Sequence, residues 1–562
     1  MSKLSDITTR QKIIVMIGAM LALFLAALDQ TIVSTAMPKI IEELNGFDKL
    51  TWVFTAYMLA STIIVPVYGK LSDIYGRRIF FLLGIVVFLI GSALSGISQN
   101  MTQLIIFRAI QGLGAGAILA NSFAIIGDLF PPSERGRWQG IFGSAWGLAS
   151  VVGPTLGGYL TDHASWRWNF YINIPVGILA FAFIFFLMPK VKHEVLDKSI
   201  DYPGAIALSV ALVSLLLGFV WGGNVYAWAS IQVIGIFLLS FISFCTFAAI
   251  EHKSQNPILP LTLFQNSIFT LSMIIVFIVG AGMFGAIIFI PLFAQSVLGI
   301  SATNSGAILT PLVLGIVIAS FISGQLVSKI GKYKSLTIFG LEVMTLGIFL
   351  LSQMNTHTSG LTLALFMVIT GAGLGVTFPI FNIVVQNAFE QSKLGVVTAA
   401  TQLFRSVGAT IGIAVMGSIV NNALANKLST ISSDPFVQTM TKYNPKLSLA
   451  NLNSNQLQNL LSPSGIGQVK SQIVKLPPQS QREIFQALAQ FANRLKEALS
   501  SAIVEVFALG SIIMLIAIAL SFFLKEIKLK DTHDQEFSFN QEEEQVPVQS
   551  NTNKKVNLAT AH

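Results

Sequence analysis

Near its N-terminus the chain reads KIIVMIGAMLALFLAALDQTIVSTAMP, from Lys12 to Pro38. Residues 13–36 carry a single charge, and they are long enough to cross a bilayer, which needs about 20 apolar residues. That charge is Asp29. A carboxylate inside a span costs at least about 2.5 kcal/mol on insertion scales, so it usually faces a water-filled cavity or a partner. The stretch predicts a membrane helix with a functional acid; the alternative is a buried ion pair without a role in transport.

The rest of the chain has the composition of a membrane protein. Its 562 residues are 53% hydrophobic and 11% charged, whereas soluble proteins carry about 25% charged residues. Mean hydropathy is +0.71. We therefore predict an all-α, polytopic membrane protein. Hydropathy places its fourteen spans near residues 13–36, 51–69, 79–99, 102–126, 138–160, 169–188, 203–221, 230–250, 267–293, 304–327, 336–352, 361–386, 397–422 and 501–524.

Residue usage argues against metal and nucleotide chemistry. The single cysteine, Cys245, lies in an apolar run, so we expect no disulfide framework and no cysteine-based metal site. Histidines fall in separate loops, without the spacing of metal ligands. A G-x-x-x-x-G-K-[ST] phosphate loop is missing from the sequence, which leaves ATP hydrolysis unsupported. We expect no bound metal or cofactor.

The basic residues follow membrane topology. The net charge is +8 and the isoelectric point about 9.4, which could suggest a nucleic-acid partner. With the N-terminus inside, however, lysine and arginine gather in the short cytoplasmic loops, as the positive-inside rule requires. We expect a multi-pass protein of the cytoplasmic membrane with both termini in the cytoplasm, and no nucleic-acid partner. The loop residues are Arg77, Arg78, Arg135, Arg137, Lys190, Lys192, Lys329, Lys332 and Lys334.

The chain also repeats itself. GKLSDIYGR at residues 69–77 recurs as GQLVSKIGK 255 residues later, and GLGAG at residues 112–116 recurs as GAGLG 259 residues later. The matches indicate two homologous six-span halves, with spans 7 and 8 as an inserted hairpin. Secondary transporters use such repeats to build a site that opens alternately to each side. The predicted parts are an N-terminal six-helix bundle (1–188), two inserted helices with linkers (189–266), spans 9–13 (267–420), an extracytoplasmic loop (421–500), span 14 (501–524) and a disordered cytoplasmic tail (525–562).

The long outer loop, residues 421–500, contains one structured candidate. Residues 482–499 place apolar side chains at helical spacing. We expect an amphipathic helix that leads into span 14, either lying on the outer membrane surface or continuing rigidly from the span. A structural hairpin is the favoured interpretation. A role in guiding cargo, or in binding a periplasmic or surface partner, is the alternative.

Four short motifs identify the family that the chain resembles. Span 1 ends LDQTIVSTAMP from Leu28, the loop after span 2 reads GKLSDIYGRR from Gly69, span 4 contains RAIQG from Arg108, and span 5 contains GLASVVGPTLGG from Gly147. Together they resemble motifs of the major facilitator superfamily, and of its fourteen-span drug:proton antiporter branch. The resemblance implies two six-helix bundles plus two inserted helices. It also implies an antiporter, driven by the proton gradient, that exports amphipathic and often cationic drug-like compounds.

Asp29 and Arg108 are the candidates for proton coupling and for recognition of substrate charge. Counted from the outer ends of their spans, both lie about 9–10 Å deep, at 1.5 Å per residue. If they face one cavity, Arg108 holds Asp29 ionised until a proton or a cation changes that balance. Alternatively, Arg108 only donates hydrogen bonds to helix carbonyls.

Two further sets of residues have predicted roles. The first is a cytoplasmic gate that stabilises one conformation: Gly69, Asp73, Gly76, Arg77, Arg78 and Asp128. The second is the antiporter helix motif, which allows close helix contact and a kink: Gly147, Gly153, Pro154, Gly157 and Gly158.

Several other residues are secondary candidates. Glu342 and Arg405 lie at similar depth in spans 11 and 13, so they are expected to pair, and Glu505 is a boundary charge at the start of span 14. Gln111, within the span 4 motif, completes this group of candidates. A negative, aromatic-lined cavity would favour lipophilic cations, with Trp146, Phe142 and Phe381 as candidate linings.

Other functions stay open at this stage. Within the transporter class, the nearest rival is an exporter of lipid, fatty acid or another metabolite. A membrane receptor or sensor would need residues 421–500 to fold independently, but their few aromatics and lack of cysteine argue against a stable core. A membrane enzyme would need polar catalytic residues that converge at one boundary, and the sequence suggests none.

Overall fold

The computed structural model describes residues 8–44, 49–188, 200–223, 225–299, 309–427 and 478–529, together with positions 436, 438, 470, 471, 473 and 474. Helices dominate these residues. The N-terminal half contains α1 (Thr9–Leu44), α2 (Leu50–Tyr75), α3 (Arg77–Gly96), α4 (Met101–Leu129), α5 (Pro132–His163), α6 (Trp168–Tyr171) and α7 (Asn173–Leu187). The middle contains α8 (Tyr202–Trp221), α9 (Ile231–Lys253) and the short helix η3 (Leu261–Gln265). The C-terminal half contains α10 (Ser267–Ser296), α12 (Thr310–Ile330), α13 (Lys334–Leu351), α14 (Gly360–Asn387), η4 (Gln391–Lys393), α15 (Leu394–Lys427) and α19 (Pro478–Phe522).

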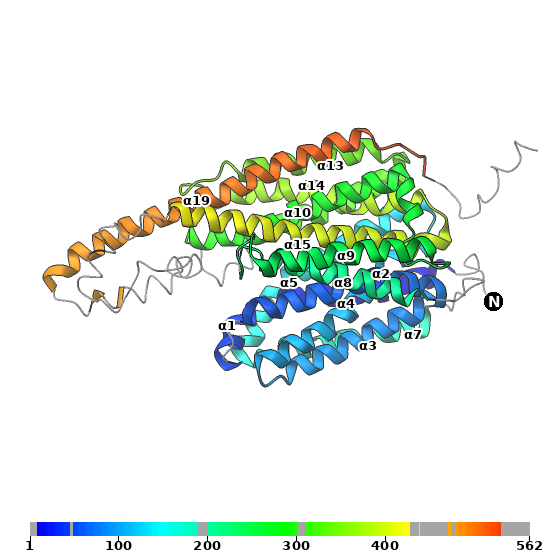
Figure 1. Cartoon of the computed structure of the whole chain (residues 1–562), viewed down its shortest axis with the longest axis horizontal. Coiled ribbons are helices and arrows are strands. Elements are labelled where there is room, and N and C mark those ends of the chain that lie inside the picture. Colours follow the sequence, from blue (N-terminus) through cyan, green and yellow to red (C-terminus); the bar gives the residue numbers. More distant parts are fainter. Residues whose placement is uncertain are drawn as a thin grey trace, which may run out of the picture.

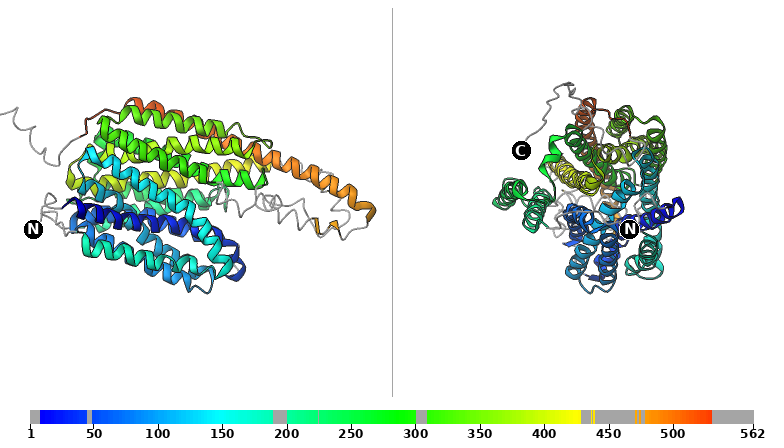
Figure 2. Two further views of the ribbon diagram at one scale, coloured as in Figure 1. Left: turned by 180° about the vertical axis from the view of Figure 1, so that it is seen from behind. Right: turned by 90° about the vertical axis from the view of Figure 1, so that its right-hand side faces the viewer.

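The long helices run roughly parallel in two halves that lie side by side (Figure 1, Figure 2). Each half buries its own apolar core, one formed by α1–α7 and the other by α10–α19. The halves meet where α5 packs along α12 and where α2 packs against α15. The inserted pair, α8 and α9, lies outside the two bundles, with α8 against α2 and α15. This arrangement matches the organisation expected from the repeat.

Within the described residues, thirteen helices are long and apolar enough to cross a membrane. The predicted span 138–160 is not among them, although α5 covers it with 32 residues. Helix α5 is rich in glycine and other small residues, which lowers its hydropathy, and its buried face packs between α1 and α12. Such a helix needs little contact with lipid. Its packing makes α5 the fourteenth membrane helix of the fold.

Helix α19 settles how the outer amphipathic segment is arranged. It is one continuous helix of 45 residues, about 67 Å at 1.5 Å per residue, and its orange N-terminal part extends beyond the other helices (Figure 1). Ile484, Leu488 and Phe491 are buried, and the Phe491 ring lies 5.1 Å from that of Phe436. The segment therefore continues from span 14 as one helix, and the alternative of a separate helix lying on the membrane surface is wrong. Most of the remaining outer loop lies outside the described residues.

The start of the C-terminal tail is held in place, contrary to the prediction of disorder from residue 525. The Tyr333 hydroxyl donates to the Lys525 carbonyl at 2.7 Å and accepts from the Ile527 N–H at 3.0 Å. Burial raises the pKa of the Tyr333 hydroxyl, so it stays protonated and can act as a donor. Residues 530–562 lie outside the described part of the chain.

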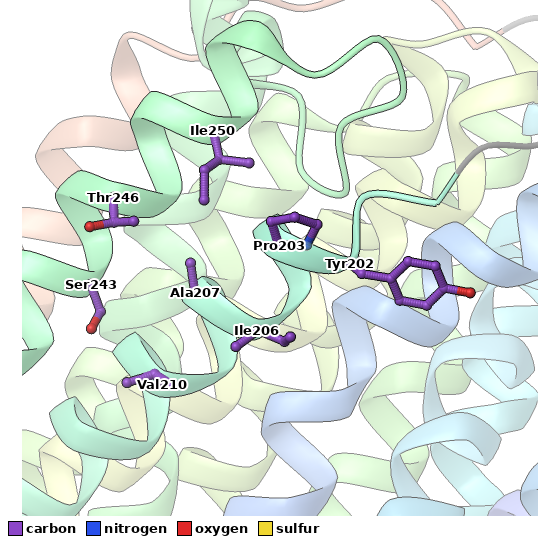
Figure 3. Close-up of a pocket in the computed structure, with 8 residues that line it drawn as sticks. All are labelled: Tyr202, Pro203, Ile206, Ala207, Val210, Ser243, Thr246 and Ile250. Atoms are coloured by element: carbon purple, nitrogen blue, oxygen red, sulfur yellow. The ribbon is translucent and has the colours of Figure 1, made fainter.

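The inserted hairpin presents an apolar groove between α8 and α9 (Figure 3). Ile206 and Tyr202 are mostly exposed, as expected for side chains that face lipid. Ser243 and Thr246 are the polar residues that line the groove, apart from the Tyr202 hydroxyl. The lining contains no charged side chain, so the groove is distinct from the site described next. The residues that line it are Tyr202, Pro203, Ile206, Ala207, Val210, Ser243, Thr246 and Ile250.

Candidate functional site

Asp29 lies at the centre of a fully buried polar cluster in the N-terminal half. Arg108 Nη1 donates to Asp29 Oδ2 at 2.5 Å. Gln111 Nε2 and Asn173 Nδ2 donate to Asp29 Oδ1 at 2.8 and 3.0 Å. A buried carboxylate is tolerated only when it is paired and hydrogen-bonded. Helices α4 and α7 provide both conditions, and the pairing suggested by residue depth is formed.

Two aromatic rings lie close to the Arg108 guanidinium. Its guanidinium carbon lies 4.2 Å from the centre of the Tyr57 ring and 5.9 Å from that of Phe170, distances at which cation–π attraction is effective. Its Nη1 also donates to Gln111 Oε1 at 2.7 Å. The alternative in which Arg108 bonds only to helix carbonyls is therefore wrong. The cluster forms a connected network that any change at Asp29 must disturb.

The cluster does not open into the space between the halves. A cavity lies there, lined from both bundles by residues of α1, α2, α4, α5, α10, α14 and α15. Asp29 is not among these residues and is 0% exposed, so in this conformation it does not line the cavity between the halves. Its neighbour Gln30 does line the cavity. The full lining is Gln30, Met58, Ser61, Thr62, Leu119, Phe123, Trp146, Met283, Phe378, Gln402, Arg405, Ser406 and Ala409.

Of the three aromatic residues expected to line the cavity, one does so. Trp146 lines the cavity, but Phe142 and Phe381 are buried within the cores of the two halves. Phe123 and Phe378 take their place. Their ring centroids are 5.8 Å apart across the boundary between the halves.

The remaining embedded charges do not pair as expected. Glu342 is exposed on α13, whereas Arg405 lines the cavity and contacts Gln402 and the Phe378 ring. The predicted Glu342–Arg405 pair is thus wrong, because the two side chains lie on different faces of the C-terminal half. Glu505 is exposed near the middle of α19.

Three residues of the predicted gate form a buried ionic latch that ties the halves together. Arg77 contacts Asp73 at 2.5 Å and Asp128 at 2.7 Å. Asp73 Oδ2 also accepts the Val396 N–H at 3.0 Å, in the first turn of α15. Helix N-termini carry unpaired N–H groups and partial positive charge, so a carboxylate there is stabilising. The latch therefore joins α2 of one half to α15 of the other.

Arg78 is not part of this latch. It donates to the Phe185 carbonyl, and its guanidinium lies 5.4 Å from the Phe185 ring. Gly69 packs against Ala399: a Cβ added at Gly69 would lie 2.5 Å from the Ala399 Cβ. Gly76 has a φ of 99°, which a side chain rarely adopts. The two glycines thus allow close helix approach and a sharp turn.

A second group of contacts joins the halves on the same side. Buried Arg135 donates to the Phe130 and Gly127 carbonyls at 2.9 and 2.8 Å, and to the Gln386 carbonyl at 3.4 Å. Gln386 lies in the final turn of α14, where backbone carbonyls have no partner within the helix. Nearby, Cβ atoms added at Gly136 and Gly324 would each lie within 2.6 Å of the other's carbonyl oxygen. The two halves are therefore held together on this side by two separate sets of contacts.

The antiporter motif on α5 serves two neighbours. A Cβ at Gly147 would lie 2.2 Å from Val317 of α12 in the other half, whereas Cβ atoms at Gly153 and Gly157 would meet α1 at Thr31 and Thr35. Pro154 lies within the continuous helix. A Cβ at Gly158 would meet no atom within 4 Å. The motif on α5 therefore packs against two helices: α1, which carries Asp29, and α12 of the other half.

Comparison with known proteins agrees with this architecture. The family model of the Major Facilitator Superfamily matches residues 19–413. The chain belongs to the Major Facilitator Superfamily. It is a multi-pass membrane protein of the kind that carries small substrates across membranes.

Two relatives and two solved structures are informative. The multidrug transporter protein MdtP of Bacillus subtilis (strain 168) is 41% identical over 522 residues, which cover 92% of this chain and 94% of that protein. Multidrug resistance protein 3 of the same organism is 39% identical over 521 residues, which cover 92% and 96%. The proton:xylose symporter XylE matches with a TM-score of 0.56 at 13% identity, over 93% of this chain and 98% of that chain. The human organic anion transporter MFSD10 matches with a TM-score of 0.55 at 17% identity, over 73% and 93%. The similarity to these two solved structures, at 17% and 13% identity, concerns the fold alone.

Sequence reasoning missed several residues of the site. Asn173 has no predicted role in the sequence analysis, although it completes the shell around Asp29. Val396 contributes only a backbone N–H to the latch, so its side chain carries no signal. Its neighbour Gly395 could have been found, because it falls in the repeat opposite Gly136.

Proposed function

We propose that the protein is a proton-coupled secondary transporter that exports amphipathic, drug-like compounds by alternating access. The observation that carries the proposal is the buried Asp29–Arg108 pair, which lies directly behind a cavity between two repeated bundles. The names of the two Bacillus relatives support drug-like cargo. The distribution of basic loop residues supports a cytoplasmic membrane location with both termini inside. No enzymatic step is needed.

Asp29 is the proposed proton carrier. Adding a proton to its carboxylate removes the charge that holds Arg108, so the network through Gln111 and Asn173 must rearrange. Gln30 already lines the cavity, and successive residues are about 100° apart around a helix because one turn has 3.6 residues. A rotation of α1 of that order, or water entry beside Gln30, connects Asp29 with the cavity. Proton exchange is thereby tied to a change of conformation.

The latch sets when the cavity can receive cargo from the cytoplasm. While Asp73 binds the N-terminus of α15 and Arg135 binds the C-terminus of α14, the cytoplasmic ends of the halves stay together. Opening breaks both contacts. The closed latch and the Asp29–Arg108 bond occur together in this structure, so proton exchange at Asp29 biases opening by as much as the closed and open states differ in their affinity for that proton. Substrate and proton then occupy the transporter in turn.

The test uses energised inside-out vesicles that contain the full chain. Respiration acidifies the vesicle interior, and an exported compound should dissipate that gradient, which a pH-sensitive dye reports. Asp29→Asn should abolish the response. Glu342→Gln is the matched acid-to-amide control, because Glu342 is exposed on α13, and it should respond like the wild type. If Asp29→Asn keeps the full response, the assignment of the proton site is wrong; if the wild type responds to no compound, the transport proposal is wrong.

A further inference from the structure

The cavity between the halves contains a buried cation. Arg405 lines it and is 5% exposed. Its Nη1 donates to Gln402 Oε1 at 3.2 Å, and its guanidinium carbon lies 4.0 Å from the centre of the Phe378 ring. A guanidinium has five N–H donors in a rigid fork, and these two neighbours satisfy only part of that capacity.

A balancing acid is missing from the described part of the cavity. The ion pairs formed by the described residues join Arg77 to Asp73 and Asp128, Arg108 to Asp29, and Arg167 to Glu43; none of them includes Arg405. Asp29, the acid nearest in sequence to a lining residue, is committed to Arg108 and turned away from the cavity. A buried charge without a counter-charge is strongly unfavourable. The site is therefore built to gain from an incoming anion.

Apolar and aromatic surface surrounds the cation. Phe123 and Phe378 face each other across the halves at 5.8 Å, and Trp146 and Met283 complete the wall. Aromatic faces of this kind accept flat rings or alkyl chains of varied shape. The cavity measures about 70 Å³ in this conformation, too small for such a body, so this surface and its one fixed positive group bind a ligand only when the halves move apart.

We propose that the cavity takes amphipathic anions, with a carboxylate or sulfonate bound by Arg405 and Gln402 and an aromatic or alkyl body held by Phe123, Phe378 and Trp146. The inference rests on the proposed export function and names the substrate class of the same cavity. It is opposite to the expectation of cationic cargo, which required Asp29 to line the cavity. A planar guanidinium binds a carboxylate through two parallel hydrogen bonds, so recognition depends on the fork as well as on the charge.

The test uses three probes with one aromatic body: naphthylacetate, naphthylacetamide and naphthylethylammonium. Binding to the purified full-length protein in nanodiscs is measured by calorimetry near neutral pH. The wild type should bind the anion most tightly and the cation most weakly. Arg405→Gln should weaken binding of the anion by about tenfold or more and leave binding of the neutral amide unchanged. Arg405→Lys should recover part of the loss, because it keeps the charge without the fork.

Two comparisons make the outcome decisive. Arg137→Gln is the matched control, because Arg137 is exposed at the cytoplasmic end of α5, and it should bind all three probes like the wild type. The inference is overturned if the wild type prefers the cation or shows no preference, or if Arg405→Gln weakens all three probes equally. In the vesicle assay, export of neutral compounds without a preference for anions would overturn this inference and leave the proposed function intact.

Discussion

Gly395→Ala is the sharpest perturbation of the ionic latch formed by Asp73, Arg77 and Asp128. An added Cβ would lie 2.2 Å from Asp73 Oδ1 and 2.3 Å from Arg77 Nη1, whereas ordinary contact begins at 3.4 Å. The carboxylate must move by about 1 Å, which carries its 3.0 Å bond with the Val396 N–H beyond hydrogen-bonding range. Hydrogen bonds to charged groups contribute about 1.5–3 kcal/mol. The ratio of closed to open molecules should therefore fall by about 10- to 150-fold.

Spin-label distance measurements between the two halves, on the side of the latch, would report this shift. Labels at Arg137→Cys and Lys332→Cys lie on exposed positions of opposite halves, in a background that carries Cys245→Ser, the chain's single cysteine. Gly395→Ala should move the distance distribution toward longer values. Gly158→Ala is the matched control, since an added Cβ there meets nothing within 4 Å. An unchanged distribution for Gly395→Ala would refute the latch.

Two further predictions concern contacts outside the transport cavity. Tyr333→Phe removes the hydroxyl that binds Lys525 and Ile527, so proteolysis within the tail should become faster while the transport activity is kept; unchanged cleavage would contradict this anchoring role. At the end of α1, the Arg167 guanidinium, and then the Trp166 indole, lower the pKa of the Glu43 carboxyl from its ordinary value of 4.5. The stabilisation from this contact is therefore present above pH 4.5 and lost as the pH falls through the lowered value. Melting curves from neutral pH to about pH 3 should show this loss in the wild type and not in Glu43→Gln, and equal slopes would argue against it.

The sequence contained enough information for the fold and for the depth of the charges. Repeated motifs and hydropathy predicted two halves and an inserted pair of helices. Counting residues from the ends of the spans placed Asp29 level with Arg108, and the two are in contact. Rise along a helix is regular, so depth is readable without coordinates. The order of the motifs likewise predicted that Asp128 returns to the side of Arg77, where the two pair.

Rotation about each helix axis is what the sequence could not provide. Glu342 and Arg405 have similar depth, but one is exposed on α13 and the other lines the cavity. Asp29 is buried, whereas Gln30, the next residue and about 100° further around the same helix, lines the cavity. Hydropathy does not encode which face turns inward, because a helix that is apolar all round is buried on several sides. The charge of the cavity was mispredicted for this reason.

Backbone contacts were also invisible to the sequence. The latch is completed by the Val396 N–H, and α14 receives Arg135 through a backbone carbonyl. These groups exist at every residue, and only the tertiary arrangement selects the pair that meets. The continuity of α19 was left open for a similar reason, since the polar residues of its outer part suit both a surface helix and an extended one.

Proton release on substrate binding tests the central claim most directly. The purified protein, in weakly buffered detergent solution, is mixed with a transported compound while a pH indicator reports released protons. The account predicts proton release on binding in the wild type, and no release in Asp29→Asn even where that variant still binds the compound. Equal release from both proteins would show that another group carries the proton.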